Sequence, residues 1–219
     1  MTSNKLRTIA LVVAALVLVI GSYIAYQKHT TRGQVSALVA DTSRHLGAAL
    51  QPNATDDVSH RQARASAAEA NARRLRALDT SKLTSFADAA DGYLITAREI
   101  LRRDADIAAA RARLTLDVDA LTTHMKSDRG AASWPQTALS LKAPLDKNLR
   151  DYGIAVQSYR SLLATLAASQ ERIAPYVDSA LLIDAALITA AGRRTLDTHA
   201  STERDVKQVI SLQAYRQAR

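Results

Sequence analysis

Asp104 and Arg111 are the residues of this sequence whose types and spacing come closest to a chemical site. They lie seven residues apart, at positions where a repeating apolar pattern places side chains inside a helical bundle. An unpaired charge is costly in such a place, so each residue needs a polar partner. Candidate partners occur on the last predicted helix: Asp184, Thr195, Thr198 and Asp205. The polar layer either fixes the register of the helices or forms a ligand site between them, unless the two residues lie off the inward face.

The rest of the sequence lacks the motifs of known catalytic chemistry. No two histidines are four residues apart, and no Glu is followed by His three residues later, so both helical metal-binding patterns are missing. Glycine-rich phosphate-binding motifs and the G-x-S-x-G nucleophile motif are also absent. Cysteine does not occur, which excludes disulfides, thiolate nucleophiles and cysteine-bound metals. We therefore expect a protein that is not an enzyme and that uses no cofactor or metal.

Arginines gather in the second predicted helix. They are Arg61, Arg64, Arg73, Arg74 and Arg76, with Glu69 as the one acid between them. Such a run is either a solvated helix face or a basic interaction face for an anionic lipid surface or an acidic partner. The segment has no Phe, Tyr or Trp that could stack on a base, so we expect no nucleic-acid partner.

The composition predicts an all-α protein. The chain has 219 residues, of which 47% are apolar and only 4% aromatic, so its core must be built mainly from small aliphatic side chains. Seven Gly and four Pro are too few for a fold of many short strands and tight turns, which excludes an all-β architecture. The formal net charge is +8, and half of it comes from Lys5, Arg7, Lys28 and Arg32.

Residues 9–26 form an uninterrupted apolar stretch without a charged side chain. At about 1.5 Å per residue, a helix of this length covers roughly 27 Å of a ~30 Å hydrocarbon core, which predicts a single transmembrane anchor. Tyr23 and Tyr26 end the stretch, where aromatic rings prefer the headgroup level. A cleaved signal peptide is the alternative, but the candidate cleavage sites place large side chains where small ones are required.

The short N-terminal tail with its free amine favours a cytoplasmic N-terminus. We therefore expect residues 1–8 to be a cytoplasmic tail, residues 9–26 the anchor, and residues 27–219 one extracytoplasmic domain. In a bacterium this arrangement corresponds to an inner-membrane protein with the bulk of the chain in the periplasm.

Beyond the anchor, apolar residues recur at steps of three and four, which is typical of long amphipathic helices with coiled-coil-like seams. Breaks that contain Pro, Gly and Asn separate five expected helices, at residues 33–51, 57–78, 81–127, 134–174 and 176–214. Pro144 lies inside the fourth and predicts a kink rather than an end. Short breaks make neighbouring helices antiparallel, so the last three should form an elongated up-down-up bundle with the first two packed against it.

These features favour three functions. The first is a bitopic inner-membrane protein whose periplasmic bundle binds other envelope proteins as a scaffold or assembly module. The second is a sensory accessory with a small-molecule site between helices, near Asp104 and Arg111. The third is a cytoplasm-facing protein that binds acidic surfaces through the arginines. In each case the lipid bilayer is a partner through residues 9–26, and the sequence is compatible with a homo-oligomer.

Overall fold

Helices make up the regular secondary structure of the described part of the chain. The computed structural model describes residues 30–52, 57–127 and 133–217. Its elements are α2 (Thr31–Leu50), α3 (Val58–Arg76), α4 (Thr84–Lys126), α5 (Trp134–Ile173), the 3₁₀ turn η1 (Ser179–Leu181) and α6 (Ala185–Gln217). The all-α prediction is confirmed over these residues, and α2 to α5 closely match the first four expected helices. α5 also runs through Pro144 without ending, as predicted.

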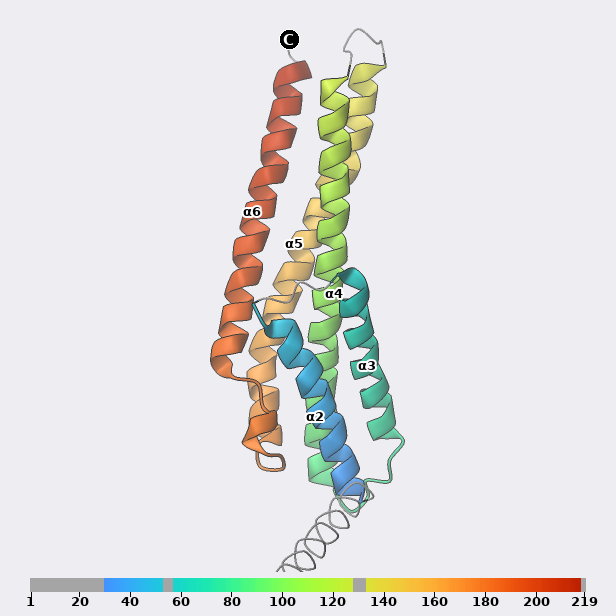
Figure 1. Cartoon of the computed structure of the whole chain (residues 1–219), viewed down its shortest axis with the longest axis vertical. Coiled ribbons are helices and arrows are strands. Elements are labelled where there is room, and N and C mark those ends of the chain that lie inside the picture. Colours follow the sequence, from blue (N-terminus) through green and yellow to red (C-terminus); the bar gives the residue numbers. More distant parts are fainter. Residues whose placement is uncertain (1–29, 53–56, 128–132, 218–219) are drawn as a thin grey trace, which may run out of the picture.

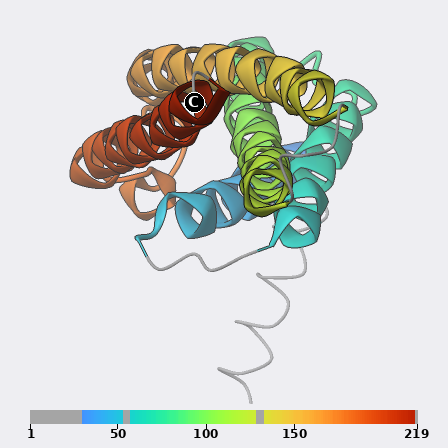
Figure 2. The same ribbon diagram turned by 90° about the horizontal axis from the view of Figure 1, so that it is seen from above.

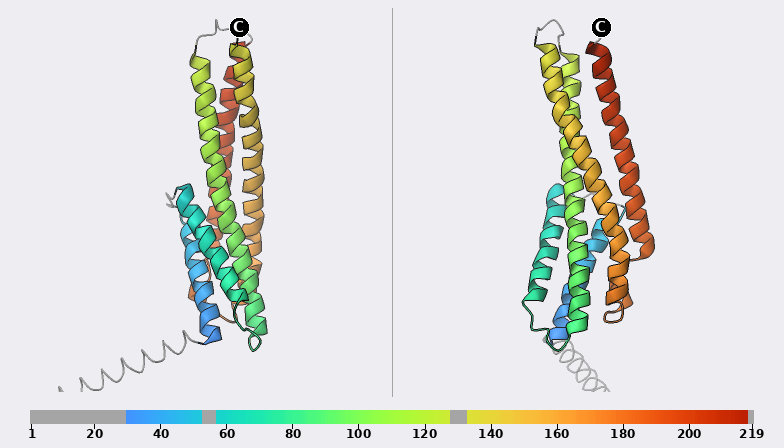
Figure 3. Two further views of the ribbon diagram at one scale, coloured as in Figure 1. Left: turned by 90° about the vertical axis from the view of Figure 1, so that its right-hand side faces the viewer. Right: turned by 180° about the vertical axis from the view of Figure 1, so that it is seen from behind.

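The helices form an elongated bundle with a shorter hairpin packed along its lower half (Figure 1). α4, α5 and α6 run up, down and up, while α2 and α3 form an antiparallel pair that covers only the lower part of α4 (Figure 3). The 43 residues of α4 span roughly 65 Å, against roughly 30 Å for the 20 residues of α2. The predicted up-down-up arrangement is therefore confirmed.

α4 is the central helix and packs against each of the other four α-helices. Seen along the long axis, α5 and α2 lie on opposite sides of α4, and α3 and α6 flank it on the remaining sides (Figure 2). This central position explains why α4 carries the longest apolar pattern of the sequence, since it has partners along its whole length.

The difference in helix length divides the apolar core into two clusters. The lower cluster takes side chains from all five α-helices. The upper cluster contains only residues of α4, α5 and α6: Leu114, Leu121, Leu145, Tyr152, Val156 and Val206. Ile107 is partly buried against both clusters and marks the level at which one passes into the other.

The lower half of α4 buries a second stripe that the single predicted seam did not include. Leu94, Leu101 and Ala105 are all buried there, although none occupies a seam position. Leu94 and Leu101 belong to the lower cluster, to which α2 and α3 also contribute side chains. A heptad pattern describes one partner face, whereas this helix has several at its lower end.

The expected helix at residues 176–214 is wrong at its start. The chain turns after α5, forms η1, and begins α6 only at Ala185. Two aspartates set these starts, because the Asp178 carboxylate accepts from the Ala180 N–H at 2.9 Å and the Asp184 carboxylate accepts from the Ala186 N–H at 2.8 Å. Gln170 of α5 then holds the connection through two hydrogen bonds with the backbone of Ile183.

The predicted cytoplasmic tail and membrane anchor, residues 1–8 and 9–26, lie outside the described residues. Within the three described ranges, none of the helices combines the length and the apolar character needed to span a bilayer.

Candidate binding cleft between the helices

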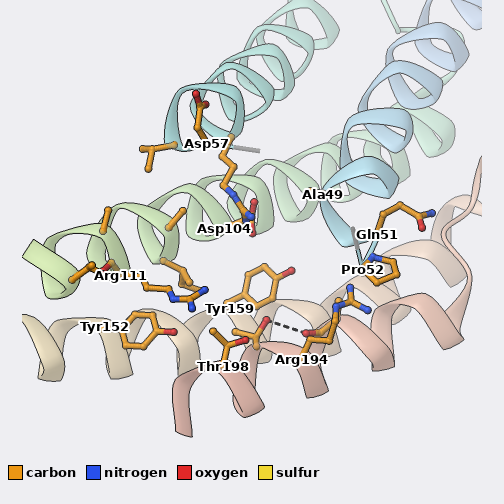
Figure 4. A pocket seen from close by; sticks show the side chains of 18 residues that line it. Ala49, Gln51, Pro52, Asp57, Asp104, Arg111, Tyr152, Tyr159, Arg194 and Thr198 are labelled. Carbon is orange, nitrogen blue, oxygen red and sulfur yellow. Dashed lines mark hydrogen bonds and ion pairs between the residues drawn. The ribbon is translucent and has the colours of Figure 1, made fainter. Parts of the chain in front are cut away.

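A cleft of about 550 Å³ opens at the middle of the molecule, at the level where α2 ends and α3 begins (Figure 4). α4, α5 and α6 all contribute to its walls. Its charged residues are Asp57, Arg61, Asp104, Arg111 and Arg194. Its hydroxyl-bearing residues are Tyr152, Tyr159, Thr115, Thr195 and Thr198.

The cleft exists because the hairpin is shorter than the bundle that it covers. Below this level α2 and α3 fill the space beside α4, and above it only α4, α5 and α6 continue. The end of α2 and the first turn of α3 therefore line the cleft from below, through Ala49, Gln51, Pro52, Asp57, Val58 and Arg61. The volume lies in the range typical of small-molecule sites, roughly 300–1,000 Å³.

Asp104 forms an ion pair with Arg61 that joins α4 to the first turns of α3. The Asp104 residue is buried, and its side chain is only 11% exposed, against 20% for Arg61. An ion pair this far from solvent is sensitive to the loss of either partner. The sequence analysis looked for the partner of Asp104 on the last helix. The partner is instead Arg61, one of the arginines of the predicted basic face.

Arg111 does not lie in the core, contrary to the seam prediction. It is exposed, and its side chain extends into the cleft from α4. The physical reason is that Arg111 lies two turns beyond Asp104, past the end of the hairpin, where neither α2 nor α3 covers that face. Arg111 forms no hydrogen bond or ion pair with the described part of the chain.

Asp184, the third residue of the predicted polar layer, does not partner Asp104 or Arg111. It is exposed and caps the first turn of α6, so the proposal that it partners Asp104 is wrong. Asp205 is also exposed. Thr195 and Thr198, by contrast, line the cleft.

Arg194 is a cleft residue that the sequence analysis missed. Its guanidinium donates a hydrogen bond to the backbone carbonyl of Leu50, the last residue of α2. A signal was present, because Arg194 follows the buried Ala191 by three residues and therefore shares its inward face. Arg194 was missed because it lies in a strongly polar run that begins at Arg193.

Two buried tyrosines form the α5 wall of the cleft. Burial raises the pKa of Tyr159, and so does the nearby charge of Asp104, whereas Arg194 and Arg61 act in the opposite direction. Burial likewise raises the pKa of Tyr152, against the effects of Thr202 and of the Arg111 charge. Both phenols therefore stay protonated at neutral pH and can donate a hydrogen bond into the cleft.

Tyr152 is further held by His199 of α6, with ring centroids 5.2 Å apart. Gly153 makes room for this contact, because a Cβ atom there would lie only 3.3 Å from the His199 Nε2 atom. The α5 and α6 walls are thus fixed to each other beside the cleft.

The predicted basic interaction face is divided in the structure. Arg61 belongs to the cleft wall, the Arg73 guanidinium pairs with Glu69 at 3.0 Å, and Arg76 pairs with Asp91 at 3.3 Å. Arg98 of α4 also contacts Glu69, at 3.1 Å. Arg64 is half-buried, and Arg74 is exposed. Acids from α3 and α4 therefore neutralise much of a segment that looks strongly basic when α3 is considered alone.

Metal-binding chemistry has no support in the described ranges, where no group of three or more His, Asp or Glu side chains is placed to hold a metal ion. Two histidines there instead contact an aspartate three or four residues earlier in the sequence. The His60 Nδ1 atom lies 2.9 Å from Asp57, and the His45 Nε2 atom lies 3.6 Å from Asp41.

Comparison of the chain with protein-family models, with curated proteins and with solved structures gave no match. The functional argument therefore rests on the chemistry of the cleft.

Proposed function

We propose that this protein is a non-catalytic binding module that holds a small molecule in the cleft between its helices. The observation that carries the proposal is the placement of Arg111 and Arg194, on two different helices, around one cleft whose remaining wall contains two buried tyrosines. A cleft with a few convergent polar groups is the usual form of a ligand site.

The alternative role for the polar residues is to fix the register of the helices. Asp104 and Arg61 fit that role, because they pair with each other in a place that is largely shielded from solvent. Arg111 does not fit it, because it is exposed and extends into an open cleft. The cleft thus combines the ion pair of Arg61 and Asp104 with the exposed guanidinium of Arg111, which extends into it.

The proposal keeps the expectation that residues 9–26 anchor the bundle in a bacterial inner membrane, with the bundle in the periplasm. α2 begins at Thr31, five residues after the apolar stretch, and ends at the cleft. A sensory accessory needs such a connection, because occupancy of the cleft can then act on α2, the helix that follows the proposed anchor in the sequence.

A protein-interaction role remains a second candidate on a separate observation. Leu116 of α4 and Ile154 of α5 are each 68% exposed, and Leu139 of α5 is 57% exposed. Single exposed apolar residues are common on protein surfaces, so this observation is weaker than the cleft. Replacing all three residues by Ser should abolish partner binding and leave ligand binding intact if the upper surface serves this role.

The test of the ligand-binding proposal uses the full-length protein in detergent. Thermal unfolding is followed with acidic, neutral and basic probes in turn, namely succinate, glucose and putrescine. A probe at 100 times its dissociation constant should stabilise the protein by about 2.7 kcal/mol. The Arg111→Gln variant should lose this stabilisation, and Arg113→Gln should retain it because Arg113 is exposed on α4 and does not line the cleft. Equal stabilisation of both variants would contradict the proposal.

A further inference from the structure

The charges around the cleft do not balance. Three arginines line it against two aspartates. Asp104 is paired with Arg61, and Asp57 accepts hydrogen bonds from the His60 N–H and from the Ser59 hydroxyl, at 2.9 and 2.7 Å. The cleft acids are therefore engaged in the structure of α3 and α4. Arg111 and Arg194 then carry two positive charges against the one negative charge of Asp57, so the groups left to meet a ligand are net positive.

These two guanidinium groups enter the cleft from opposite sides. Arg111 extends from α4 and Arg194 from α6, and the ring of Tyr159 lies between them (Figure 4). The Arg194 guanidinium donates one hydrogen bond to the Leu50 carbonyl. An arginine has five N–H donors, so others remain for a ligand. The remaining donors of Arg194 can therefore form charge-assisted hydrogen bonds with an acidic group of a ligand.

The rest of the wall matches a ligand with a short uncharged body. Ala108, Ala112 and Ile107 supply apolar surface between the charged groups. Thr195 and Thr198 supply hydroxyls on the α6 side. The Thr195 hydroxyl already donates to the Ala191 carbonyl at 2.9 Å, so its oxygen can only accept a hydrogen bond from a ligand.

We infer that the cleft binds a small dicarboxylate, with one acidic group held by Arg111 and the other by Arg194. The inference deepens the proposed function and rests on it. A ligand with a single acidic group would pair with one guanidinium and leave the other without an anionic partner, whereas two acidic groups pair with both. The planar fork of each arginine also matches a carboxylate with two parallel hydrogen bonds.

The inference is tested by isothermal titration of the full-length protein with acids that differ in one feature at a time. Succinate, glutarate and adipate vary the separation of two carboxylates, and butyrate is the matched acid with one carboxylate. At least one of the dicarboxylates should bind about tenfold more tightly than butyrate, or better. Inorganic phosphate is included because an arginine fork also fits it.

The variants assign each carboxylate to its arginine. Arg111→Gln should reduce the preference for the best dicarboxylate over butyrate to less than about threefold, because one acidic group then has no cationic partner. Arg113→Gln, on the same helix but outside the cleft, should leave the preference unchanged. Arg194→Lys keeps the positive charge on α6 and should retain part of the preference, and circular dichroism establishes that it folds.

The outcomes separate the inference from the proposed function. Equal binding of butyrate and the dicarboxylates overturns the inference, as does tighter binding of phosphate than of any dicarboxylate. Absence of binding by every acid at about 10 mM also overturns it. If glucose or putrescine then binds and Arg111→Gln abolishes that binding, the proposed function stands without the inference. If no probe of either series depends on Arg111, both fail together.

Discussion

The guanidinium of Arg194, in the middle of the molecule, donates a hydrogen bond to the carbonyl of Leu50, the last residue of α2. The last carbonyls of a helix have no partner within it and carry the negative end of the helix dipole, so a cation there is favourable. This contact joins α6, one wall of the cleft, to the helix that leads back toward the N-terminal apolar stretch.

Loss of the Arg194 contact should loosen the end of α2. We expect Arg194→Ala to lower the free energy of unfolding by about 1.5–3 kcal/mol, the typical contribution of a hydrogen bond to a charged group. Backbone amides of the last two turns of α2 should exchange faster with solvent, as measured by hydrogen exchange and mass spectrometry. Arg193→Ala is the matched control, because Arg193 is exposed and its loss should leave exchange in α2 unchanged. Unaltered protection at Leu46 and Leu50 in Arg194→Ala would show that the contact does not hold α2.

The ion pair between Arg61 and Asp104 should be far more sensitive to mutation than the exposed Arg111. We expect Asp104→Ala to cost about 3 kcal/mol or more in urea unfolding, because the Arg61 charge would lose its counter-charge in a place largely shielded from water. Arg111→Ala should cost less than about 0.5 kcal/mol.

Replacing Asp104 and Arg61 together by Leu should recover most of the stability lost in the single variant, because both members of this ion pair are then removed. If Asp104→Ala and Arg111→Ala cost the same, the contrast in burial between the two residues does not govern stability.

The sequence predicted which side chains face inward where a neighbouring helix is present. It did not predict where the neighbouring hairpin of α2 and α3 ends. The heptad pattern placed Asp104 and Tyr152 correctly, because each lies on a face with a partner at its own level. It misplaced Arg111 because helical periodicity carries no information about the length of the neighbouring hairpin.

The pairing of Arg61 with Asp104 was also beyond the sequence, since it depends on how α3 is set against α4. The same limit applies to the arginines of α3. Arg76 is neutralised by Asp91, a residue of the following helix, and only the tertiary structure brings the two together. Charge density along a sequence therefore overstated the positive charge of that surface.

A buried hydrogen bond between hydroxyl groups joins α2 to α4 and offers a clean test of their packing. The Ser43 Oγ and Tyr93 phenol oxygens are 2.7 Å apart, and both residues are buried. We expect Ser43→Ala to cost about 1–3 kcal/mol, because it leaves the Tyr93 hydroxyl without its partner away from water. The double variant Ser43→Ala with Tyr93→Phe should cost less than the sum of the two single variants, because it removes both polar groups. Additive costs in urea unfolding would show that the two hydroxyls are not coupled.

Alkaline pH should destabilise the bundle through its buried tyrosines. Burial raises the pKa values of Tyr93, Tyr152 and Tyr159 above the ordinary value of 10.0. Because the folded-state pKa is the higher one, the folded protein holds these protons more tightly than the unfolded chain does. This stabilising contribution is complete below about pH 10 and is lost as the pH rises through the folded pKa values. The free energy of unfolding should therefore fall above pH 10, and tyrosinate absorbance should rise together with the loss of helical circular dichroism.

Tyr159→Phe removes one of the three groups and should make the fall less steep. If instead all the tyrosinate absorbance develops while the helical signal is intact, the three phenols ionise without unfolding and the argument from burial is wrong.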